Sequence, residues 1–163
     1  MRGVTSHFNE DTVFDQILFG LMRLMIGITP ILLGIYFFTL FIGKSSISGP
    51  YRLSVLLGII IFLAASGIGG MMISKGSHTI GAADGSRGIL FFNWSKTFGD
   101  LRIAHFIGLH AIQIIPMSCY LLLSKTNSLN IVYILLTVLF LAYSYTVYAM
   151  YTHALSGFPL FFK

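Results

Sequence analysis

The sequence is poor in charge and in cysteine. Charged side chains make up only 9% of its 163 residues, whereas a soluble domain carries about 25%. Hydrophobic residues make up 56%, and the mean hydropathy is +0.87. Such a chain cannot cover itself with polar surface, so its exterior is expected to face lipid. The single cysteine, Cys119, excludes an intrachain disulfide.

Several motifs with known chemistry are absent as well. The chain has no P-loop and no GxSxG, HExxH or CxxC motif. Its five histidines are too few for the histidine-rich pattern of membrane di-iron desaturases. No basic run with interleaved aromatic residues occurs, so nucleic acid is not an expected partner. These absences leave open whether the protein is an enzyme.

Four apolar segments are long enough to cross a bilayer, whose hydrocarbon core of about 30 Å needs about 20 helical residues. The short links between the first two segments and between the last two predict antiparallel neighbours. We therefore expect an all-α fold, an integral membrane four-helix bundle that forms a single transmembrane domain over residues 1–163. The predicted spans cover about residues 14–42, 53–74, 101–123 and 130–152.

The connection 75–100 is the one long loop, between the second and third predicted helices. Its five glycines interrupt any regular pattern. Its centre, GILFFNW at 88–94, is apolar and aromatic, which is typical of a segment at the membrane interface or folded back over the bundle.

The distribution of basic residues predicts an orientation. Four spans place both termini and the loop 75–100 on one side, which carries six basic residues against three on the other. We therefore expect a bacterial inner membrane protein with cytoplasmic N- and C-termini. The two groups are Arg2, Lys75, Arg87, Lys96, Arg102 and Lys163, and Lys44, Arg52 and Lys125.

Polar side chains gather in the same leaflet. The stretch GDLRIAHFIGLHAIQ at 99–113 carries Arg102, His105, His110 and Gln113. At about 100° per residue these four fit an arc of about 140°, which is expected to face the bundle interior. Arg23 enters the first span to about the depth of His110, about 14 Å.

All five histidines belong to this side of the predicted bundle, with His7, His78 and His153 near its surface. We predict a ligand or cofactor site there, with His105 and His110 as candidate metal ligands. Ordinary hydrogen bonds between helices are the alternative for each histidine. Arg102 is expected either to extend its charged end to the surface or to pair with Asp100. The candidate site consists of His105, His110, His78, Arg23, Arg102 and Gln113.

Small residues recur on two helices. Gly20, Gly27 and Gly34 share one face of the first span, and AASGIGG at 64–70 holds two small-xxx-small pairs. Both patterns predict close helix packing or room for a flat cofactor. The glycine face of the first span is also a candidate homodimer interface.

Several of these stretches resemble a group of small, four-span bacterial membrane proteins. The similarity covers HTIGAADG at 78–85, NWS at 93–95, the stretch 99–113 and ALSGFPL at 154–160. In that group the central stretch reads GDLR-x-x-HF-x-GLH-x-x-Q, which residues 99–113 match. His153 departs from the group, where glutamine is usual, which weakens any role for it as an axial ligand. The resemblance implies a membrane protein but no reaction.

Three functions remain open from sequence. The first is binding of haem b or a transition metal for electron transfer. His105 and His110 would each face a different partner helix, with His78 or His153 as the second ligand. Arg23 or Arg102 would neutralise the haem propionates. The second is non-catalytic binding or transport of a small ligand or lipid. The third is an accessory subunit of a larger membrane complex.

Overall fold

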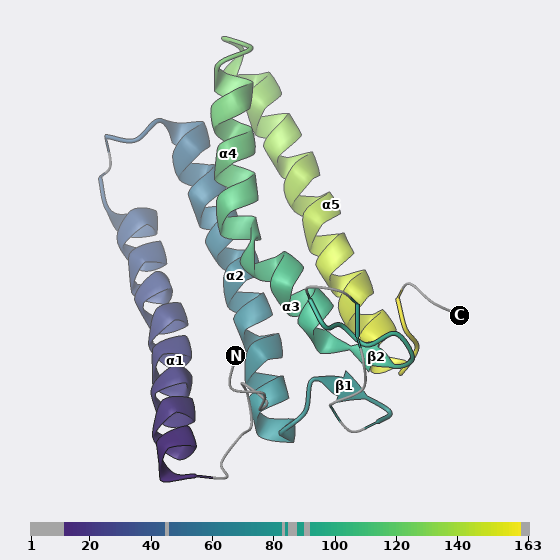
Figure 1. The fold of residues 1–163 in the computed structure, drawn as a ribbon. Helices are drawn as coiled ribbons and strands as arrows, with labels where there is room; N and C mark the ends of the chain where they lie inside the picture. Colours follow the sequence, from purple (N-terminus) through teal and green to yellow (C-terminus); the bar gives the residue numbers. More distant parts are fainter. Residues whose placement is uncertain (1–11, 45, 83, 85–87, 90–91, 161–163) are drawn as a thin grey trace.

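The computed structural model describes residues 12–44, 46–82, 84, 88–89 and 92–160. Figure 1 shows long helices side by side and a small sheet at one end. Within these ranges, four helical stretches are long and apolar enough to cross a membrane: Val13–Ile42, Gly49–Lys75, Leu101–Leu123 and Leu129–Leu155. The predicted four apolar helices are therefore confirmed. The elements are α1 (Val13–Ile42), α2 (Gly49–Lys75), β1 (Thr79–Ile80), β2 (Gly99–Asp100), α3 (Leu101–Leu109), α4 (Ala111–Leu123) and α5 (Leu129–Leu155).

Helices α2 to α5 form the packed part of the molecule, and α1 stands beside them (Figure 1). The hydrophobic core cluster of the described residues takes its buried members from α2, α3, α4 and α5, with none from α1. In α1 only Asp15, Phe19 and Leu40 are buried. Most of the α1 surface therefore faces away from the other helices, as a lipid-facing helix would.

Glycine permits the closest approaches of α2 to its neighbours. A Cβ on Gly108 of α3 would overlap the Ala65 side chain of α2, and one on Gly58 of α2 would lie 3.0 Å from the Ala111 carbonyl oxygen. The small residues Ala65 and Gly69 pack against α3, as AASGIGG predicts. By contrast, the three glycines of α1 meet no neighbour: a Cβ built on Gly20, Gly27 or Gly34 would lie more than 4 Å from any other atom considered. The prediction that these glycines pack against another helix of this chain is therefore wrong.

The third span is bent rather than continuous. Helix α3 ends at Leu109, α4 begins at Ala111, and their axes differ in Figure 1. The His110 amide donates to the Ile107 carbonyl at 3.2 Å, and this oxygen also accepts from Tyr143 Oη of α5 at 2.7 Å. Pro116, one turn into α4, has no N–H to continue the helical pattern. The buried residues keep one helical phase across this bend: Leu101, Ala104, Gly108, Ala111 and Ile115.

The connection between α2 and α3 is anchored at both ends. β1 and β2 pair antiparallel, with Thr79 opposite Asp100. The Gly99 amide donates to the Gly157 carbonyl at 2.9 Å, which joins the sheet to the end of α5. Residues 83 and 85–87 of this connection, and 90–91 in its predicted apolar centre, lie outside the described residues.

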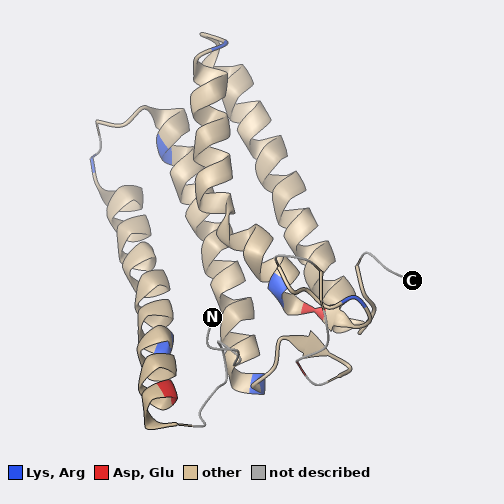
Figure 2. Ribbon diagram, viewed as in Figure 1, with Lys and Arg blue, Asp and Glu red and all other residues tan. Residues whose placement is uncertain are grey.

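Charge is distributed unequally between the two ends of the helices (Figure 2). The described carboxylates, Asp15, Asp84 and Asp100, all lie where α1 and α3 begin and α2 ends. Basic residues occur at both ends, with Lys44 and Arg52 at the opposite one. The predicted gathering of acidic groups at one end holds for the described carboxylates.

Candidate functional site

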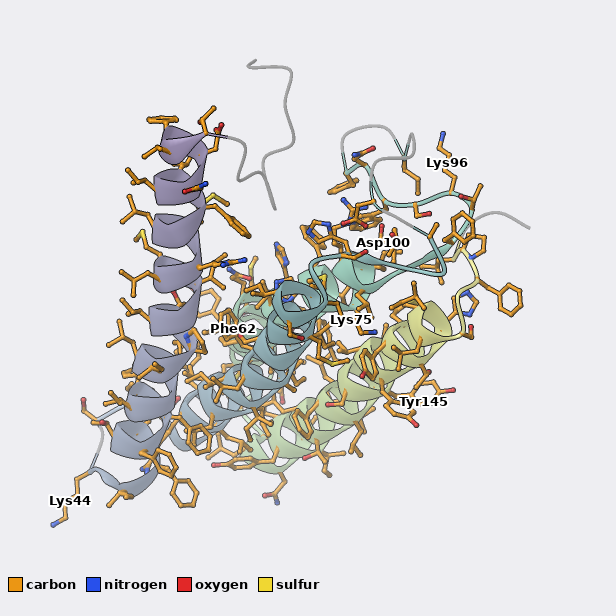
Figure 3. The ribbon with its side chains drawn as sticks, turned by 90° about the horizontal axis from the view of Figure 1, so that it is seen from below. Lys44, Phe62, Lys75, Lys96, Asp100 and Tyr145 are labelled. Carbon is orange, nitrogen blue, oxygen red and sulfur yellow. The ribbon has the colours of Figure 1, made fainter. Side chains whose placement is uncertain are left out.

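A cavity of about 520 Å³ lies between α1, α2, α3 and the connection before β2. Figure 3 shows side chains of α1 and α2 extended into the space between these helices. Four of the six predicted site residues line it: Arg23, His78, Arg102 and His105. They come from α1, the start of the connection and α3, so only the tertiary arrangement brings them together. No carboxylate is among the described lining residues.

His105 is held in one orientation. Its Nδ1 lies 2.7 Å from the Ala65 carbonyl oxygen of α2. A carbonyl oxygen only accepts, so Nδ1 carries the hydrogen and Nε2 of the neutral ring is an acceptor. Gly69 makes room for the ring, because a Cβ there would lie 2.7 Å from His105 Cε1.

His78 is oriented by Asp84, a carboxylate outside the predicted set of site residues. Its Nδ1 lies 2.7 Å from Asp84 Oδ2. The carboxylate also accepts from the His78 amide at 2.9 Å and from Thr79 Oγ1 at 2.7 Å. Burial raises the pKa of Asp84, but these hydrogen bonds outweigh it and hold the pKa at about 2. The quoted stretch HTIGAADG contains both partners and is the signal for this pair.

Arg102 fastens the connection to the start of α3. Its Nη2 lies 2.6 Å from Asp100 Oδ2 and donates to the Asn93 carbonyl at 2.6 Å. Asp100 is 2% exposed, and it also accepts from the Ser95 amide at 2.8 Å. The predicted pairing of Arg102 with Asp100 is confirmed, and it holds residues 93–95 against α3.

Aromatic rings form one wall of the cavity. Phe92 and Trp94 stack with centroids 4.7 Å apart, and each lies edge-on to Phe106 at 5.7 Å. On the opposite side, the Arg23 guanidinium lies 4.0 Å from the Phe19 ring centroid. The apolar GILFFNW segment is the sequence signal for this wall, and its described residues fold back over α3.

Two predicted site residues lie outside the cavity lining. His110 Nδ1 bonds the Phe106 carbonyl at 2.7 Å, and the His110 ring lies 4.2 Å from that of Phe106. Gln113 is exposed. The prediction that Gln113 faces the bundle interior is wrong, because the apolar face of this span, and not its polar arc, packs against the other helices. Its buried residues keep one helical phase across the bend: Leu101, Ala104, Gly108, Ala111 and Ile115.

Among the described residues, histidine donors do not gather into a multidentate metal site. The described residues hold no group of three or more His, Cys, Asp or Glu side chains suited to a metal ion. His153 lies at the end of α5, where its Nε2 is 3.2 Å from the Pro159 carbonyl oxygen, and His7 lies outside the described residues. Haem b needs only axial ligands, so its binding stays a prediction.

The chain matches no protein-family model, no curated protein and no solved structure. The resemblance to small four-span bacterial membrane proteins therefore stays a prediction. Function has to be inferred from the cavity and from the chemistry of its walls.

Proposed function

We propose that this protein is a multi-pass membrane protein that binds an anionic amphiphile, such as a lipid, in the cavity between α1, α2 and α3. All four apolar helices would span the bilayer as a bundle, with both termini at the cytoplasmic face of a bacterial inner membrane. The cavity would then lie in the cytoplasmic leaflet, with its apolar walls toward the membrane interior. Membership of a larger membrane complex stays a prediction.

The observation that carries this function is the composition of the cavity lining. Two guanidinium groups, of Arg23 and Arg102, line the cavity, and the carboxylate that pairs with Arg102, Asp100, is not among its described lining residues. Charge-assisted hydrogen bonds from guanidinium are the preferred protein contacts of phosphate and carboxylate groups. The remaining walls are largely aliphatic and aromatic, which suits a hydrocarbon chain.

The loose packing of α1 supports entry from the lipid. Few of its residues are buried, and it contributes none to the core cluster of the described residues. An element with few buried contacts opens at low free-energy cost. A ligand would therefore enter from the bilayer by displacement of α1, without disruption of the α2–α5 core.

Trp94, the only tryptophan of the chain, gives a direct test of this function. It lines the cavity, so titration with an anionic lipid in detergent is expected to change its fluorescence. Arg23→Ala is expected to weaken binding about tenfold, the usual effect of losing a charged hydrogen bond. Arg52→Ala, at the opposite end of the helices, is the matched control. Equal effects of the two substitutions, or equal binding of a zwitterionic lipid, would contradict the proposal.

Haem b is the second candidate, favoured by the two anchored imidazoles. Nδ1 of both His78 and His105 lies 2.7 Å from an oxygen, as is usual for histidines that bind a metal through Nε2. The absorption spectrum of the purified protein, as isolated and after dithionite, distinguishes the two. A Soret band that is lost in His105→Ala would favour haem, and a colourless protein that does not take up added haem would exclude it.

A further inference from the structure

The anchored ring of His105 restricts which anionic group fits the cavity. Nδ1 donates to the Ala65 carbonyl, and the described residues supply no hydrogen bond to Nε2. A Cβ on Gly69 would lie 3.4 Å from Nε2 and 2.7 Å from Cε1, so the ring lies directly against α2. The cavity therefore presents a fixed hydrogen-bond acceptor beside its cationic groups.

An acceptor is a poor neighbour for an anion that has no hydrogen. A fully ionised phosphodiester offers only lone pairs, which would face the lone pair of Nε2. Arg102 contributes Nε and Nη2 to Asp100, whereas Nη1 takes no part in these bonds. A matching ligand would accept from guanidinium and share one proton with the imidazole.

A phosphate monoester has both properties. Its second pKa is about 6. Near neutral pH the monoester therefore carries one P–O–H group or takes up that proton at a small free-energy cost. The monoanion donates its O–H to neutral Nε2, which a phosphodiester cannot do. A single proton then lies between Nε2 and a phosphate oxygen, and the other oxygens remain free for guanidinium.

We propose that the cavity selects lipids with a phosphate monoester head group over phosphodiester lipids. This inference rests on the proposed function, because it names the ligand class of the same cavity. His105 supplies the selectivity, and the arginines supply the attraction that any anionic head group shares.

Native mass spectrometry of the full chain in detergent tests the selectivity. The protein is mixed with equimolar dioleoyl phosphatidic acid, phosphatidylglycerol and phosphatidylcholine, and oleate and inorganic phosphate are offered separately. We expect phosphatidic acid to bind about tenfold tighter than phosphatidylglycerol, the effect of one charge-assisted hydrogen bond.

Two substitutions at the imidazole separate the proposed role from general damage. His105→Asn keeps an amide donor for the Ala65 carbonyl but removes Nε2, so the preference for phosphatidic acid is expected to vanish. Gly69→Ala displaces the anchored ring and should reduce the preference. Gly70→Ala is the matched control, because a Cβ there meets no atom within 4 Å. Retained selectivity in His105→Asn would overturn the role of His105.

The lipid arms distinguish failure of this inference from failure of the proposed function. Equal binding of phosphatidic acid and phosphatidylglycerol, both above phosphatidylcholine, overturns the selectivity but leaves anionic binding intact. Oleate bound as tightly as phosphatidic acid also overturns it. If inorganic phosphate binds as tightly as phosphatidic acid, recognition of the phosphate monoester is supported, but the proposal that the ligand is a lipid is overturned. No discrimination against phosphatidylcholine overturns both.

Discussion

At the residue scale, three polar side chains of the cavity lining are each held by a specific partner. Ala65 orients His105 through a carbonyl, Asp84 orients His78, and Asp100 holds Arg102. Within a bilayer such partners matter, because water is not available to satisfy a misplaced polar group. The residues that line the cavity are therefore positioned before any ligand binds, which lowers the entropic cost of binding.

Asp84 makes the turn around His78 and Thr79 sensitive to acid. Its pKa is lowered from 3.8 to about 2, so the folded state favours the ionised carboxylate. The stabilisation is complete above pH 3.8 and is lost as the pH falls through about 2. Hydrogen exchange at the His78 and Thr79 amides, corrected for the intrinsic pH dependence, should rise over this interval.

Asp84→Asn is the control for that titration. It cannot ionise, so exchange at the two amides should already be faster at pH 7 and should change little between pH 4 and pH 2. A variant that retained the acid-dependent increase would show that another group is responsible.

At the element scale, small residues decide which helices touch. Gly108 and Ala65 bring α3 against α2, whereas Gly27 of α1 meets no neighbour within 4 Å. The two glycines look alike in sequence, since both stand in apolar helices. Contacts with α2 therefore set the position of α3, and with it the position of His105.

Gly108→Leu is expected to destabilise the fold by about 1–3 kcal/mol, the usual cost of an overpacked core. Gly27→Leu is the matched substitution and should change the free energy of unfolding by less than about 0.5 kcal/mol. Thermal unfolding of both variants in the same detergent measures the difference. Equal destabilisation would show that the α1 face packs against something, such as a second copy of the chain.

At the scale of the whole molecule, the asymmetric charge predicts how the protein sits in a membrane. The described carboxylates lie at one end, and basic residues occur at both ends, as Figure 2 shows. The six-to-three distribution of basic residues in the sequence favours the carboxylate end as cytoplasmic.

Single-cysteine labelling measures this orientation in a Cys119→Ala background. A membrane-impermeant maleimide should label Ser46→Cys, between α1 and α2, in intact cells. Lys96→Cys and Ser156→Cys should react only after the membrane is opened, because they lie at the other end of the helices. Labelling of all three in intact cells would contradict the four-span arrangement.

Much of this architecture follows from composition and periodicity alone. Apolar segments near 20 residues have few alternatives to a membrane helix, and charge is too scarce to cover a soluble surface. The sequence alone therefore determined the four apolar helices and the gathering of polar residues toward one end. It also indicated Arg23, His78, Arg102 and His105 as site residues.

The tertiary structure alone decided which of the predicted residues share a cavity. A helical wheel shows which residues share a face but not which face packs against other helices, so it cannot show that His105 lines the cavity whereas Gln113 is exposed. The hydrogen bond of His105 to the Ala65 carbonyl joins residues 40 apart in the sequence. Local patterns cannot specify such contacts, because they depend on packing between helices.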